Sequence, residues 1–162
     1  MSKTRTSLDT IASVVSLLAV LALGLSAGAM LTEAAVLVPY WRSLPPESFL
    51  DWYAANASLL FNFFGPLEIG GAVLAVAAAA LHGYGRRPGR SLLIVSAVLT
   101  LAVLAAFPLY FQDVNARFAA GTIARDSVAT ELAAWAWWHW LRTAIGASAF
   151  VAVMLGVRAD RQ

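Results

Sequence analysis

The sequence contains no cysteine, and charged residues make up only 12% of its 162 residues. Without cysteine the chain has no disulfide, no thiolate metal site and no thiol catalysis. A soluble domain carries about 25% charged residues, so half that share leaves too little polar surface to face water. Because hydrophobic residues make up 60% of the chain, the composition predicts an integral membrane protein whose main partner is the lipid bilayer.

Several functional signatures are also missing from the sequence. It has no glycine-rich phosphate-binding loop, no haem attachment motif and no Ser/His/Asp combination at a suitable depth. The formal net charge is +2 and comes from basic loops. That pattern is usual for membrane topology and does not indicate nucleic-acid binding.

Four apolar runs are each long enough to cross a bilayer as a helix, which takes about 20 residues. They cover residues 11–39, 57–81, 91–111 and 131–157. The sequence therefore predicts an all-α fold, with residues 1–162 forming a single membrane domain built as a four-helix bundle.

The loop between the first two spans has its own pattern. Pro45 and Pro46 open a segment rich in aromatic residues, and proline is tolerated at a helix start because the first N–H groups have no helical partner. We therefore expect a short amphipathic helix over residues 48–56 in this outer loop. Its simplest role is an interfacial anchor, and a lid over a site is the alternative.

The distribution of Lys and Arg predicts the orientation. With four spans, both termini lie on one side of the membrane. The basic residues of that side are Lys3, Arg5, Arg86, Arg87, Arg90, Arg158 and Arg161. Those of the opposite side are Arg42, Arg117 and Arg125. Because basic residues are enriched in cytoplasmic loops, we expect both termini in the cytoplasm and the protein in the bacterial inner (plasma) membrane.

One stretch of the last span differs from the rest of the chain: residues 135–143 read W-A-W-W-H-W-L-R-T. His139 and Arg142 are three residues apart and share a helix face, with Trp135 one turn earlier. An arginine at membrane depth keeps its charge and needs a partner. At about 1.5 Å rise per residue, Arg142 and Glu68 both lie roughly 16 Å below the outer boundary of the bundle. We therefore expect these two residues to pair.

Glu33 and His139 fall near the same depth, roughly 10 and 12 Å below that boundary. Four ionisable groups from three spans then lie in the outer half of the bundle, which indicates a pocket opening outward. Simpler alternatives remain for each group. For Glu68 and Arg142 the alternative is a purely structural ion pair, and for Glu33 it is a protonated, hydrogen-bonded carboxyl group. For His139 it is a buried histidine that is hydrogen-bonded to a carbonyl or a carboxylate.

A metal site is a further alternative for the same residues. Glu33, Glu68 and His139 are a carboxylate-rich set that iron or zinc could use. The Glu-x-x-His pairing of di-iron bundles is missing, because neither glutamate is followed by a histidine three residues on. We therefore predict no metal and no other cofactor, with iron or zinc at these three residues as the alternative.

Three short motifs carry a resemblance to a known family. The first is L-P-P-E-S-F at residues 44–49, and the second is a third span that ends in a proline, Pro108, followed by Asn115. The third is W-x-x-x-H-x-x-R-T, from Trp135 to Thr143. With these motifs the chain resembles the anthrone oxygenase-like family of small four-helix membrane proteins, most of whose bacterial members are assigned only to a domain of unknown function.

The resemblance implies an oxidoreductase of the monooxygenase class, which oxidises a lipophilic aromatic substrate of the anthrone or quinol type without a cofactor. His139 would be the base, Arg142 the partner of the developing oxyanion, and Glu68 would orient Arg142. The expected substrate-binding residues are Glu33, Asn62, Phe63, Phe64, Asn115, Trp135 and Trp138. A non-enzymatic membrane subunit or a lipophile-binding protein, with a structural polar cluster, is the alternative. The sequence leaves a homo-oligomer open.

Overall fold

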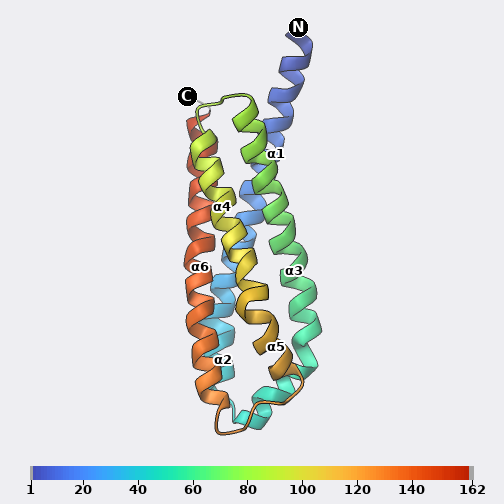
Figure 1. Ribbon diagram of the computed structural model, residues 1–162, viewed down its shortest axis with the longest axis vertical. Coiled ribbons are helices and arrows are strands. Elements are labelled where there is room, and N and C mark those ends of the chain that lie inside the picture. The colour runs from blue at the N-terminus through green and yellow to red at the C-terminus, as the bar shows by residue number, and fades with distance from the viewer. Residues whose placement is uncertain (1, 161–162) are drawn as a thin grey trace.

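The computed structural model describes the backbone of residues 2–160 and the side chains of residues 7–160. Over this range the chain is helical and contains no strand. Arg161 and the side chains of Lys3 and Arg5, which contribute to the predicted orientation, lie outside the described residues. Four helices in the described chain are long and apolar enough to cross a membrane, and Figure 1 shows them running along a common axis. The predicted all-α fold with four candidate spans is confirmed.

The first and third spans are each built from consecutive helical pieces. The elements in chain order are α1 (Ser2–Thr32), η1 (Glu33–Leu37), α2 (Val38–Ser43), α3 (Pro46–Tyr84), α4 (Arg90–Ala106), η2 (Phe107–Phe111), α5 (Gln112–Ala119) and α6 (Val128–Ala159). The candidate spans are therefore Ser7–Ser43, Pro46–Tyr84, Arg90–Ala119 and Val128–Ala159. Each is longer than the apolar run that predicted it, because the helices continue into polar and aromatic residues at both ends.

The elements η1 and η2 are single π-helical turns, and a proline accompanies each of them. Pro39 follows η1 by two residues, and Pro108 lies inside η2. A proline in a helix lacks the N–H that would bond to residue i−4 and its ring crowds that carbonyl, so the helix widens locally instead of ending. The widened turns contain Glu33 and Phe111, both of which face the interior.

Residues 48–56 do not form a separate helix, contrary to the expectation from the sequence. They are the first turns of α3, which begins at Pro46 and continues without a break to Tyr84. No glycine or proline follows Pro46 until Gly65 and Pro66, so nothing ends the helix near residue 56. In Figure 1 these first turns lie across the lower end of the bundle.

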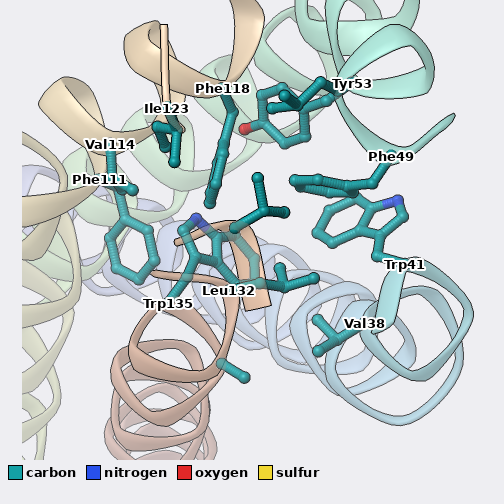
Figure 2. Close-up of a cluster of buried hydrophobic side chains, with 13 residues drawn as sticks. Val38, Trp41, Phe49, Tyr53, Phe111, Val114, Phe118, Ile123, Leu132 and Trp135 are labelled. Carbon is teal, nitrogen blue, oxygen red and sulfur yellow. The ribbon is translucent and has the colours of Figure 1, made fainter. Parts of the chain in front are cut away.

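Aromatic side chains form the core at this end of the bundle (Figure 2). The buried members of this end core are Val38, Trp41, Phe49, Leu50, Tyr53, Phe111, Val114, Phe118, Ile123, Val128, Leu132, Trp135 and Ala136. Trp41 packs against the rings of Tyr53 and Trp135 at 5.7 and 5.4 Å between ring centroids. Phe49 meets Phe118 edge to face at 5.0 Å. These edge-on contacts are a preferred aromatic geometry, and they fill the end of the bundle.

At the opposite end of the bundle, where both termini lie (Figure 1), the helices pack against one another mainly through alanine side chains. A side chain at Gly89 would collide with the backbone carbonyl of Gly156, so α4 and α6 touch backbone to backbone. Arg87, in the turn before α4, donates from Nε to Oδ1 of Asp160 at 2.8 Å. Asp160 also lies 3.5 Å from Nε2 of the buried His82. This network ties the end of α6 to the turn between α3 and α4.

Candidate functional site

Four ionisable side chains from three spans meet inside the bundle, and we call them the charge cluster: Glu33, Glu68, His139 and Arg142. They come from η1, α3 and α6. Their exposed fractions are 5%, 7%, 0% and 6%, respectively. The residue count along the spans predicts that all four lie in the outer half of the bundle, and the structure brings them into contact.

Arg142 lies between the two carboxylates. Its Nη1 is 3.6 Å from Oε1 of Glu68, which is the expected pair, and its Nη2 is 3.6 Å from Oε2 of Glu33. These are ion pairs rather than hydrogen bonds, because an N–H···O bond spans about 2.7–3.2 Å. The guanidinium also lies over the ring of Phe111, with Cζ 4.5 Å from the ring centroid, which is cation–π geometry. Arg142 is thus held on three sides.

His139 uses both of its ring nitrogens inside the cluster. Nε2 lies 2.9 Å from the carbonyl oxygen of Met30, and Nδ1 lies 3.3 Å from Nε of Arg142, which donates to it. A neutral imidazole has one donor and one acceptor nitrogen, so Nε2–H donates to Met30 and Nδ1 accepts from Arg142. Trp135 covers the ring, stacked at 4.8 Å between centroids. Both ring nitrogens of His139 therefore have hydrogen-bond partners inside the protein, and Trp135 covers the ring. This arrangement matches the alternative in which His139 is a buried, hydrogen-bonded histidine and not the base.

A cavity of about 770 Å³ lies beside the charge cluster, between α3 and the third span. Its volume is within the roughly 300–1,000 Å³ typical of small-molecule sites. Its lining residues are Glu33, Tyr53, Ala57, Leu60, Phe61, Phe64, Gly65, Glu68, Ile69, Leu101, Leu104, Ala105, Phe107, Pro108, Gln112, Asn115, Ala116, Ala119, Trp135 and Arg142. We call it the lateral cavity. Three members of the charge cluster, all except His139, form part of its wall.

The lateral cavity is open along the side of the bundle. Phe61, Ile69 and Leu101 line it and are about half exposed, at 58%, 54% and 46%. These residues lie on α3 and α4, where the surface of a membrane-spanning bundle faces lipid. The sequence predicted a pocket that opens outward from the outer half of the bundle, and the aromatic end core occupies much of the end of that half. A lateral opening is the route that the helix packing provides.

Trp135 and Asn115 form a polar contact at the cavity wall. The indole Nε1 donates to Oδ1 of Asn115 at 2.8 Å, which joins α6 to α5. The bond fixes the plane of the indole that stacks on His139. Both residues were expected to bind substrate, and both line the cavity.

Three residues expected to bind substrate lie elsewhere. Asn62 and Phe63 are exposed on α3, on a different face from Phe64, which lines the cavity. The cavity face of α3 repeats every three to four residues, so neighbours in sequence cannot all belong to it. Trp138 is 37% exposed and stacks on Tyr110 at 5.1 Å, outside the cavity wall. These three residues therefore do not line the lateral cavity, and their expected role in substrate binding stays a prediction.

Sequence reasoning missed two aromatic residues and one carbonyl. Phe111 packs under Arg142, and its spacing of four residues from Asn115 would have placed both on one helix face. Tyr53 lines the cavity and belongs to the aromatic segment that was assigned to a separate helix. The Met30 carbonyl that binds His139 has no signal in the sequence, because it depends on how α1 and α6 pack.

The carboxylates and the histidine are arranged around Arg142 and not around an open position. The described part of the chain contains no group of three or more His, Cys, Asp or Glu side chains that could hold a metal ion. Glu33 and Glu68 each face a guanidinium nitrogen of Arg142. The iron or zinc alternative at Glu33, Glu68 and His139 therefore has no support in the geometry of these side chains.

No protein-family model, curated protein or solved structure matches this chain. The resemblance to the anthrone oxygenase-like family thus stays a prediction from the sequence motifs. What the protein does is inferred from the lateral cavity and the charge cluster.

Proposed function

We propose that the chain is a membrane-embedded oxygenase that oxidises a lipophilic aromatic molecule of the anthrone or quinol type in the lateral cavity. One observation carries the proposal: a cavity of about 770 Å³ has a buried arginine and two carboxylates in an otherwise apolar and aromatic wall. Ionisable groups at membrane depth mark functional sites by default. The motifs shared with the anthrone oxygenase-like family support the same activity.

The base in this proposal is a carboxylate that lines the cavity. His139 is fully buried and does not line it, and its acceptor nitrogen is occupied by Arg142. Glu68 lines the cavity, and its buried Oε1 faces Arg142 Nη1 at 3.6 Å, so the ion pair holds the carboxylate in place at the cavity wall. We therefore assign proton abstraction to Glu68. His139 becomes a positioning residue, which holds Arg142 through Nε and is itself held by the Met30 carbonyl.

The first step moves a proton from substrate to Glu68. The acidic carbon of an anthrone is a CH₂ group between two aromatic rings and opposite a carbonyl, so the anion places negative charge on that oxygen. Arg142 is the one cation of the charge cluster and lines the cavity, and it stabilises this oxyanion. The total charge in the site is unchanged by the transfer, because Glu68 becomes neutral as the substrate becomes anionic.

The second step consumes O₂ and needs no external reductant. The anion gives one electron to O₂, and the resulting radical and superoxide combine to form a peroxide at the same carbon. Loss of water from the protonated peroxide leaves a carbonyl. One oxygen atom enters the product and the other leaves as water, so the CH₂ group is oxidised to C=O by one molecule of O₂.

The membrane placement is part of the proposal. Both chain ends lie at one end of the bundle (Figure 1), as an even number of spans requires. We assign that end to the cytoplasm of a bacterium, because it carries the larger share of basic residues. The lateral cavity lies toward the opposite end, where Tyr53 and Ala119 line it.

An oxygen-uptake assay with an anthrone, on purified protein treated with a chelator, tests the activity. We expect Glu68→Gln to lower the rate by roughly 10²–10⁴, the usual contribution of a positioned base. Glu131→Gln is the matched control, since Glu131 pairs with Arg117 outside the cavity and should leave the rate unchanged. If His139→Ala loses activity and Glu68→Gln keeps it, His139 is the base and Glu68 is not. Activity that disappears on chelation and returns with iron would favour a metal-dependent oxidase.

A lipophile-binding protein without chemistry is the second candidate. The observation that favours it is the histidine, whose two ring nitrogens are occupied within the protein. In that case the protein would bind the anthrone, as measured by quenching of tryptophan fluorescence, and would consume no O₂. Binding together with oxygen uptake supports the oxygenase.

A further inference from the structure

The carboxylates of the charge cluster lack hydrogen-bond donors. Within the described part of the chain, Glu33 Oε2 and Glu68 Oε1 are buried and accept no hydrogen bond. Their closest polar contacts are the ion pairs of 3.6 Å with Arg142 and, for Glu33, a contact of 3.6 Å with His139 Nε2. That histidine N–H is already directed to the Met30 carbonyl at 2.9 Å. These two oxygens are sealed against Arg142, but both carboxylates line the lateral cavity, so a donor group in the cavity would supply a hydrogen bond that the described residues do not provide.

The charge balance of the cluster disfavours an anionic ligand. Among the described side chains in contact there, Arg142 is the one cation facing Glu33 and Glu68, and His139 is neutral because its Nδ1 accepts from Arg142. With both carboxylates ionised, the cluster carries one negative charge. With one of them protonated, it carries none. In neither state does it offer a surplus positive charge to a carboxylate or phosphate head.

Both carboxylates face the same space. Glu33 and Glu68 come from different helices and line the lateral cavity together with Arg142. The rest of the wall supplies Phe61, Phe64 and aliphatic side chains. A ligand that fits this wall is therefore apolar along its body and offers a hydrogen-bond donor at one end.

We propose that the lateral cavity selects a neutral lipophilic molecule that presents a hydroxyl group to Glu33 and Glu68, and that it discriminates against the same molecule with a carboxylate in that position. This inference rests on the proposed function, because it describes the substrate of the same cavity. The hydroxyl donates to a carboxylate, and Arg142, which also lines the cavity, stabilises the negative charge that develops later in the reaction.

Binding of three probes with one apolar body tests the selection. The probes are 2-naphthol, 2-methoxynaphthalene and 2-naphthoate, titrated into the full chain in lipid nanodiscs, with empty nanodiscs as the blank. We expect 2-naphthol to bind roughly 10- to 100-fold more tightly than 2-methoxynaphthalene, since a hydrogen bond to a charged group contributes about that factor. We expect 2-naphthoate to bind more weakly than 2-naphthol by at least the same factor.

Removing the negative charge of Glu68 should change the relative affinities of the three probes. In Glu68→Gln the preference for 2-naphthol over 2-naphthoate should shrink by about tenfold or more, whereas Glu131→Gln should keep it. Equal binding of 2-naphthol and its methyl ether by the unmodified protein would overturn the donor requirement, and tightest binding of 2-naphthoate would show an anion site. Both results would leave a ligand-binding cavity in place. Binding of none of the probes would overturn the proposed function itself.

Discussion

At the scale of single residues, Arg142 determines the arrangement of the site. It pairs with Glu33 and Glu68, donates to His139 and lies over Phe111. A guanidinium stays charged at any physiological pH. The apolar bundle therefore has to bury this charge together with the residues that pair with it. Removing the cation is then more disruptive than removing either carboxylate, because one carboxylate can still pair.

Arg142→Met should lower the free energy of unfolding by about 3–5 kcal/mol, since two buried carboxylates lose their cation. Adding Glu68→Leu should recover part of that loss, because one of the two unpaired charges is then gone. Glu68→Ala alone should be milder, since Glu33 still pairs with Arg142. Denaturation of purified protein in detergent measures all three. An Arg142→Met protein as stable as the unmodified one would mean that the observed ion pairs do not stabilise the fold.

Two adjacent phenylalanines provide a matched test of the cavity wall. Phe64 lines the lateral cavity, whereas Phe63 is 58% exposed on the outside of α3. Phe64→Ala should weaken binding of an aromatic substrate roughly tenfold, because a ring-to-ring contact is lost. Phe63→Ala should leave binding unchanged. Equal effects of the two substitutions on KM would argue against the lateral cavity as the substrate site.

At the scale of the elements, the two π-helical turns and the long helix α3 decide where the site lies. η1 places Glu33 toward the interior, and η2 does the same for Phe111. The first turns of α3 carry aromatic residues of the end core, and its middle carries the cavity face. The first turns of α3 thus contribute Tyr53 to both the end core and the cavity wall, and its middle contributes the exposed Phe61 and Ile69 at the lateral opening.

Because the chain has no cysteine, the orientation of these elements can be tested with single introduced cysteines. Pro88→Cys lies in the turn between α3 and α4, and Thr122→Cys lies in the connection between α5 and α6 at the opposite end. In intact cells we expect a membrane-impermeant thiol reagent to label position 122 and not position 88. Labelling of position 88 alone would reverse the orientation.

At the scale of the whole molecule, the sequence predicts the bundle well because long apolar runs separated by polar loops have few other solutions in a bilayer. Counting the helical rise was enough to place Glu33, Glu68, His139 and Arg142 in the outer half of the bundle, roughly 10 to 16 Å below its boundary. The count could not predict whether Asn62, Phe63 and Trp138 lie toward the cavity or on the outer surface. That depends on how each helix is rotated about its axis relative to its neighbours. The contact between His139 and Met30 depends on the same packing, as does the lateral opening.

The order of the charged residues along the chain has a consequence for how the protein is made. Glu33 and Glu68 belong to the first two spans and Arg142 to the last, so the carboxylates are synthesised and enter the membrane before the arginine. An arginine at the centre of an isolated helix opposes insertion by about 2.5–3.5 kcal/mol. When the final helix leaves the ribosome, its counter-ions are already in the bilayer and offset that penalty. We therefore expect the ion pairs of the finished site to ease insertion of the last span, which has the lowest mean hydropathy of the four.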